Sequence, residues 1–112
     1  MEILTRKNGN ITIIAINGRL DSSTAREFTG IIETCIANGE LHFIINVSGL
    51  VFISSAGLNS FVTLAKKLQE QGGKIIFVAM NERIERIFKL TGFYNTLFNV
   101  YDSEETALKE LQ

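Results

Sequence analysis

The sequence predicts an α/β fold in which about four α-helices cover a mixed, mostly parallel β-sheet. Short runs of apolar and β-branched residues alternate along the chain with longer segments whose apolar residues recur every three or four positions. Gly and Asn separate these segments, and the chain contains no proline. Strands that alternate with helices pair in parallel through right-handed crossovers. We therefore expect the element order ββαβαβαβα.

The length and composition indicate one domain, residues 1–112. Of the 112 residues, 46% are hydrophobic and 21% are charged. That length leaves no room for a second hydrophobic core, and the composition is that of a folded chain.

The first two predicted strands form a hairpin. Residues 2–7 and 10–17 are rich in apolar and β-branched residues, and Asn8-Gly9 between them is typical of a type I′ turn. A hairpin joins antiparallel strands, so we expect one antiparallel strand near an edge of the sheet.

The first predicted helix follows a cluster of capping residues at 21–24. Thr24 and Glu27 have the spacing of a capping box, and Asn38-Gly39 marks the end of the helix. Its apolar residues form one stripe that should face the core: Ala25, Phe28, Ile31, Ile32, Cys35 and Ile36.

The rest of the chain repeats the alternation of strand and helix. Further strands are predicted at 41–47, 74–79 and 97–101. Residues 50–53 lead into the second helix at Ser54-Ser55, and the third helix begins at Asn81. Asp102 and Glu105 have capping-box spacing at the start of the last helix.

Composition excludes several classes of function. A formal charge of −1 argues against nucleic-acid binding, and the apolar runs are too short to insert into a membrane. Residues 1–6 lack the features of a secretory signal, so we expect a cytoplasmic protein. One cysteine and one histidine cannot supply a disulfide or a structural metal site.

No catalytic apparatus is evident. His42 lies within a predicted strand, where a histidine is more often a packing or surface residue than a catalyst, and Cys35 falls on an apolar stripe. Phosphate-binding loops and nucleophile elbows are absent from the sequence. Paired carboxylates occur in the first turns of predicted helices, where the helix dipole favours them: Glu82 with Glu85 and Glu104 with Glu105. We predict no catalytic residue, no metal and no cofactor.

Two serines followed by small residues stand at a strand-to-helix turn, in the segment Ser54-Ser55-Ala56-Gly57-Leu58. Taken alone, this pattern indicates a helix N-cap, in which a serine oxygen accepts from a free backbone N–H, a contact worth about 1 kcal/mol.

Two segments carry a resemblance to a known family. Residues 46–58, NVSGLVFISSAGL, resemble the phosphorylation segment of the bacterial anti-sigma-factor antagonists, the STAS domain family. Residues 18–25, GRLDSSTA, are similar to the family's second signature, at the entry to the first helix. The likeness extends to the element order and the size, so it covers essentially the whole chain.

The resemblance implies a phosphorylation-controlled binding module and not an enzyme. In the family, the unmodified domain binds a serine kinase that is also an anti-sigma factor, which frees the sigma factor. The kinase then phosphorylates the domain, and a PPM-type phosphatase reverses the modification. Carried onto this chain, the phosphoacceptor is Ser55, with Ser54 as the alternative. The residues expected to bind the partner are Asp21, Ser22, Ser23, Ser54, Ala56, Gly57 and Asn59.

The small residues Ala56 and Gly57 are expected to let the partner approach the hydroxyl closely. The chain departs from the family pattern at two positions. Ser54 and Asn46 stand where members often carry Asp, which we interpret as the loss of two carboxylates near the acceptor.

Two other functions stay open. A STAS-like chain can also be a subunit that does not switch and that docks on a membrane lipid or anion transporter, a role that needs no phosphoacceptor. A small enzyme or nucleotide-binding protein is the third possibility, and no phosphate loop or paired base and nucleophile supports it.

Overall fold

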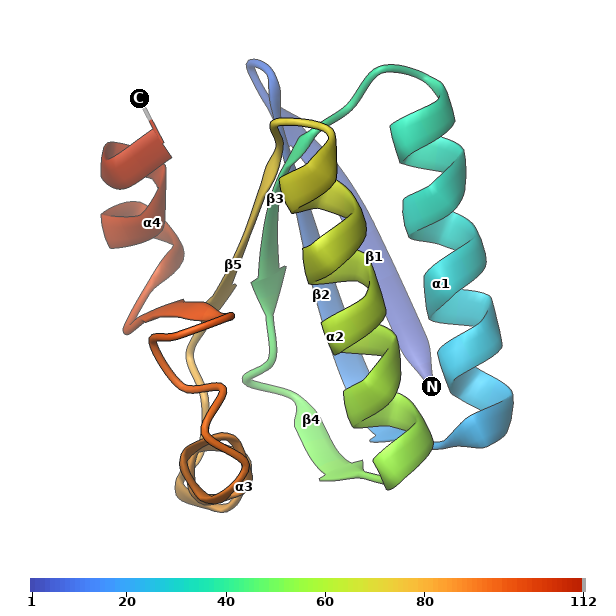
Figure 1. Ribbon diagram of the computed structural model, residues 1–112, viewed down its shortest axis with the longest axis vertical. Coiled ribbons are helices and arrows are strands. Elements are labelled where there is room, and N and C mark those ends of the chain that lie inside the picture. The colour runs from blue at the N-terminus through green and yellow to red at the C-terminus, as the bar shows by residue number, and fades with distance from the viewer. Residues whose placement is uncertain (112) are drawn as a thin grey trace.

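The computed structural model describes residues 1–111, so the predicted end of the domain at Gln112 lies outside the described residues (Figure 1). In chain order the elements are β1 (Glu2–Asn8), β2 (Ile11–Leu20), α1 (Ser22–Ala37), β3 (His42–Asn46), β4 (Leu50–Ile53), α2 (Ser55–Glu70), β5 (Lys74–Val78), α3 (Glu82–Leu90), β6 (Asn99–Tyr101) and α4 (Glu104–Leu111). Within residues 1–111 no helix is both long and apolar enough to cross a membrane.

The predicted fold class is confirmed. The sheet has the order β1-β2-β3-β5-β6, in which β1 is an antiparallel edge strand and the other neighbours are parallel. The predicted element order fits, and the structure adds the short strand β4, which pairs with the last residues of β2. Four residues are too few for a strand period to show in the sequence, so this segment was not predicted as a strand.

The hairpin differs from its prediction in turn type and in the length of its second strand. Asn8 pairs with Ile11, which leaves Gly9 and Asn10 as the two-residue loop. Only Gly9 of these two has a positive φ, 62°, as in a type II′ turn and not a type I′ turn. β2 continues to Leu20, beyond the predicted residue 17, because β4 pairs with its end.

The main core lies between the sheet and helices α1 and α2, which run side by side over one of its faces (Figure 1). Its centre is a cluster of buried aromatic rings with centroids 4.8 to 6.4 Å apart, formed by Phe28, Phe61, Phe77, Phe88 and Phe98. A smaller cluster on the other face packs under Ala107 of α4 and consists of Ile11, Ile13, Ile44, Ile76 and Val78. Since Phe61 is on α2, the aromatic cluster fixes the helix that carries the two serines.

Two capping predictions were off by one or three residues. The capping box of α1 joins Asp21 and Thr24, and Glu27 takes no part in it. At α4 the hydroxyl of Ser103, and not the carboxylate of Asp102, accepts from the backbone N–H of Thr106 at 3.2 Å. Both segments contain several residues able to cap, so spacing alone did not identify the pair that does.

Candidate functional site

The starts of α1 and α2 meet at the end of β2. Leu20, the last residue of β2, is followed directly by Asp21, the N-cap of α1. The carbonyl oxygen of Leu20 accepts from the backbone N–H of Ser54, the N-cap of α2, at 2.9 Å. One residue of the sheet therefore holds both helix N-termini, and it brings together the two sequence segments that carry the family resemblance.

The two candidate phosphoacceptors have different environments. Ser54 is half-buried, and its Oγ accepts from the backbone N–H of Gly57 at 3.2 Å. Ser55 is the first residue of α2 and is exposed, and no hydrogen bond joins its hydroxyl to another residue within 1–111. Ser54 thus acts as the N-cap of α2, while the Ser55 hydroxyl is accessible from solvent.

The start of α2 is suited to an anion. The first N–H groups of a helix have no partner inside it, and Gly57 N–H is already taken by Ser54. The N–H groups of Ser55 and Ala56 remain at the positive end of the helix dipole. Neither α1 nor α2 has an acidic residue in its first turn, whereas α3 and α4 each have two. Negative charge at the start of α2 would therefore meet no fixed carboxylate of that turn.

Asp21 has a structural role in addition to any contact with a partner. Its Oδ1 accepts from the backbone N–H groups of Ser23 and Thr24, both at 3.1 Å, and from the Ser23 hydroxyl at 2.9 Å. The hydrogen bond from Thr24 N–H and that from the Ser23 hydroxyl are the main reasons why the pKa of Asp21 is lowered to about 2. Asp21 is therefore ionised at neutral pH and held at the start of α1.

A shallow hollow of about 490 Å³ joins the two helices beside the serines. It is lined by Ser22, Ala25, Arg26, Thr29, Gly30, Glu33 and Ala56. Ser22, Ser23 and Ala56 are exposed, as is Asn59, which follows Ser55 by one helical turn. Arg26 was missed in the sequence, although it follows Ser22 by four residues on a helix, which places both on one face.

Gly57 does not offer a surface to a partner, contrary to the expectation from its small size. It is buried, and a Cβ built on it would lie 2.6 Å from the Leu20 carbonyl oxygen and 3.0 Å from Cγ1 of Ile53. Gly57 is needed because α2 packs closely on the end of β2. Of the two small residues, only Ala56 is at the surface.

Asn46 ends β3, but its side chain does not face α2. Its side-chain amide donates to Glu104 of α4 at 2.8 Å, and its Oδ1 accepts from the backbone N–H of Ser48 at 2.9 Å. The side chain faces the α4 side of the sheet, whereas α2 lies on the other side. An Asp at this position would not place its charge beside Ser55, so the interpretation of Asn46 as a carboxylate lost near the acceptor is wrong.

His42 and Cys35 lie away from the serines. His42 opens β3 and pairs with Ile11 at the start of β2, while Ser55 follows the carboxyl ends of the strands. Cys35 is in the last turn of α1, where burial raises the pKa of its thiol. Neither side chain reaches Ser55, so neither could serve it as a base.

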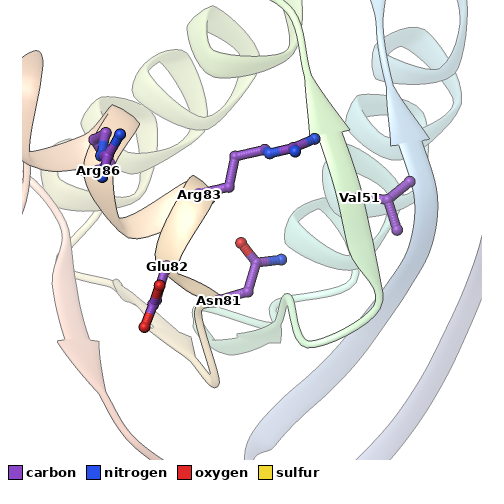
Figure 2. Close-up of a pocket in the computed structure, with 5 residues that line it drawn as sticks. All are labelled: Val51, Asn81, Glu82, Arg83 and Arg86. Atoms are coloured by element: carbon purple, nitrogen blue, oxygen red, sulfur yellow. The ribbon is translucent and has the colours of Figure 1, made fainter.

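A larger hollow, of about 660 Å³, lies between β4 and the start of α3 (Figure 2). Asn81 caps α3 by accepting from the N–H of Ile84 and donates to the carbonyl of Leu50, both at 2.9 Å, which ties α3 to β4. Figure 2 shows Arg83 reaching from α3 toward β4, while Glu82 points away. The remaining lining residues are Val51, which is 57% exposed, and Arg86. No motif in the sequence predicted this hollow, because its walls come from two separate elements.

Comparison with known proteins adds to this geometry. The family model of the STAS domain matches residues 2–107 of the chain. The chain belongs to the STAS domain family. The match spans both signature segments and every strand of the sheet, so it includes the STAS surface formed by the starts of α1 and α2.

Relatives of this STAS domain include anti-sigma-factor antagonists. The chain is 23% identical over 113 residues to the anti-sigma F factor antagonist of Paenibacillus polymyxa, which covers 100% of this chain and 96% of the relative. The unphosphorylated anti-sigma factor antagonist SpoIIAA has a TM-score of 0.79 at 20% identity, covering 98% of this chain and 97% of SpoIIAA. Phosphorylated SpoIIAA, from Bacillus, also has a TM-score of 0.79, at 19% identity, covering 99% and 100%. At these identities the two structures show a shared fold.

Proposed function

We propose that this STAS domain is an anti-sigma-factor antagonist controlled by phosphorylation of Ser55. In its unmodified form it binds an anti-sigma serine kinase through the starts of α1 and α2, and the sigma factor or other target of that kinase is released. A PPM-type phosphatase restores the unmodified form. The observation that carries the proposal is the exposed, unbonded hydroxyl of Ser55 beside the N-terminus of α1.

The names of relatives and the character of the family support this assignment. The Paenibacillus polymyxa relative matched over the whole chain is named an anti-sigma F factor antagonist. Members of the STAS family of antagonists are binding modules and not catalysts, which agrees with a serine that has no base beside it. The kinase must then supply the base and the metal ion, and this domain needs only to present an accessible hydroxyl.

Phosphorylation of Ser55 is compatible with the fold. A phosphate adds about −1.5 to −2 charges and three acceptor oxygens. At the first position of α2 these oxygens are near the free N–H groups of Ser55 and Ala56 and the positive end of the helix dipole. The α2 helix is held on the sheet by the packing of Phe61 and by the Ser54–Leu20 hydrogen bond, neither of which involves the Ser55 side chain.

Since the fold tolerates the phosphate, the loss of kinase binding on phosphorylation must arise at the interface with the kinase. A partner that covers the starts of α1 and α2 removes water from the Ser55 side chain. A dianion buried there without a cation opposite it costs several kcal/mol. That penalty is large enough to weaken a micromolar affinity by a factor of about 100 or more, since each 1.4 kcal/mol changes an affinity about tenfold.

The test is phosphorylation by the cognate anti-sigma kinase with ATP, followed by mass spectrometric mapping. We expect one phosphate, on Ser55, that persists in Ser54→Ala and is lost in Ser55→Ala. A phosphate on neither serine, or one that is unchanged in Ser55→Ala, would overturn the proposal. Binding of the kinase without any phosphorylation would favour the alternative of a docking subunit that does not switch.

A further inference from the structure

The outer edge of the sheet at β1 has no strand beside it. Within residues 1–111, β1 pairs only with β2, and its seven residues leave one row of backbone N–H and C=O groups open. Leu4, in the middle of this strand, is 54% exposed, one of three large hydrophobic residues in the described chain that are exposed. An open edge with an exposed leucine is a template for another strand.

The hairpin determines which backbone groups point outward. A two-residue loop is closed by a hydrogen-bonded pair, here Asn8 with Ile11, and hydrogen-bonded pairs then recur at every second residue. Glu2, Leu4 and Arg6 therefore direct their backbone groups toward β2. The backbone groups of the residues between them point outward: Ile3, Thr5 and Lys7.

This alternation restricts how two copies of β1 could pair about a two-fold axis. The two copies can form hydrogen bonds only where residues with outward-pointing backbone groups lie opposite each other. The two-fold axis therefore has to pass through a residue and not between two residues. An axis at Leu4 places Glu2 of each copy opposite Arg6 of the other copy. It also places the two Leu4 residues opposite each other. An axis at Thr5 would instead place Leu4 against Arg6 and Ile3 against Lys7. Only the axis at Leu4 combines two pairs of opposite charges with a central apolar contact.

The side chains of this register meet on the face of the sheet that α4 leaves open. Leu4 lies opposite Ala15 and Arg6 opposite Ile13, and Ile13 belongs to the cluster under α4. That helix has its main contacts with β3, β5 and β6, and it reaches β1 through the ion pair between Glu104 and Arg6. A hollow of about 190 Å³ remains beside the edge, lined by Leu4, Thr5, Arg6, Ile13, Ala15 and Glu104. Leu4 of a second copy would cover part of this hollow.

We propose that two copies of this chain pair through their β1 strands, antiparallel about Leu4, with Glu2 of each copy beside Arg6 of the other. Arg6 forms an ion pair with Glu104 in the single chain, and Glu2 of the second copy adds another carboxylate to the same guanidinium. Charged residues on an edge strand usually prevent pairing. Here their signs are opposite and symmetric, so they favour one register and disfavour the others.

The interface is small, because it consists of one short strand from each copy. Contacts of this size are weak, so association should depend on concentration over about 0.02 to 1 mM. Ser55 lies at the start of α2 and not on β1, so the pairing is independent of the proposed phosphorylation. A failure of one would leave the other standing.

Sedimentation equilibrium of the full chain tests the pairing, with circular dichroism to check that each variant is folded. We expect the mean mass of the wild-type protein to rise toward that of a dimer with concentration. Glu2→Arg and Arg6→Glu should each remain monomeric, because each places like charges opposite each other. An equimolar mixture of the two should form a dimer, since Arg then faces Glu at both positions.

Leu4→Glu supplies a second route to the same test, because the exposed position tolerates a charge in the monomer and brings two carboxylates together in the dimer. The matched controls are Glu105→Arg and Lys109→Glu on α4, which make the same charge changes away from β1 and should associate as the wild type does. A wild-type chain that stays monomeric up to 1 mM, a single charge reversal that still dimerises, or a mixture that stays monomeric would each overturn the proposal.

Discussion

The backbone N–H of Ser54 donates a 2.9 Å hydrogen bond to the carbonyl oxygen of Leu20. This bond joins the N-cap of α2 to the residue that precedes Asp21, the N-cap of α1. Two helix N-termini that are more than thirty residues apart in the sequence are thereby held side by side. The surface that we assign to partner binding depends on this junction.

The two neighbouring serines should respond differently to removal of the hydroxyl. Ser54→Ala removes the cap oxygen from Gly57 N–H and should lower the free energy of unfolding by about 1 kcal/mol. Ser55→Ala removes an exposed hydroxyl without a partner and should change it by less than about 0.5 kcal/mol. Urea unfolding of both variants measures this difference. Equal losses of stability would show that Ser55 also caps the helix.

Two glycines in helices should respond to alanine with opposite signs. Gly57→Ala places a Cβ 2.6 Å from the Leu20 carbonyl oxygen, so α2 must shift, at a cost of about 1–3 kcal/mol. Gly30 lies within α1 with open space where its Cβ would be. Gly30→Ala should therefore stabilise the protein by about 0.5–1 kcal/mol. Chemical denaturation of both variants provides the comparison, and a neutral Gly57→Ala would contradict the close packing on β2.

Asp21 should give the protein part of its stability against acid. Its pKa is about 2 in the folded chain, below the value of about 3.9 in an unfolded one. The stabilisation is fully present above about pH 5 and is lost as the pH falls toward 2. Asp21→Asn keeps the cap but does not titrate at this position.

The measurement is urea unfolding of the wild type and Asp21→Asn at several pH values between 6 and 2.5. The stability of the wild type relative to the variant should decrease as the pH falls through this range. A difference that does not vary with pH would mean that the carboxylate has the same pKa in both states.

Asn81 should stabilise the protein through two separate hydrogen bonds. Asn81→Ala removes both the cap on Ile84 N–H and the donor to Leu50, and should cost about 1–2 kcal/mol. Asn81→Asp keeps the cap but cannot donate to a carbonyl, so its stability should lie between those of the wild type and Asn81→Ala. Thermal unfolding ranks the three proteins. If Asn81→Asp equals the wild type, the link from α3 to β4 contributes nothing.

Local patterns in the sequence were enough for most of the fold. The spacing of Phe28 and Ile32, and of Phe61 and Leu68, predicted which faces of α1 and α2 are buried. Asn81 was identified correctly as a cap because no other capping residue stands near it. Where capping residues crowd together, as around Asp21, the pattern could not identify the box.

Features that depend on contacts between distant residues were not predictable. β4 exists as a strand because β2 extends beyond β3 to meet it, and nothing in four residues signals this. The small size of Gly57 suggested that a partner could approach closely there. A glycine is needed at this position because the Leu20 carbonyl, 37 positions earlier in the chain, leaves no room for a Cβ. For the same reason Asn46 was placed near Ser55, when its amide binds Glu104 on the other side of the sheet.

The most direct test of the proposed switch is titration of the cognate anti-sigma kinase with this protein, unmodified and phosphorylated on Ser55, by isothermal calorimetry. We predict that the phosphate weakens binding by a factor of about 100 or more, corresponding to a few kcal/mol, while the thermal unfolding temperature does not fall. Equal affinity of the two forms would contradict it, and so would loss of binding accompanied by unfolding.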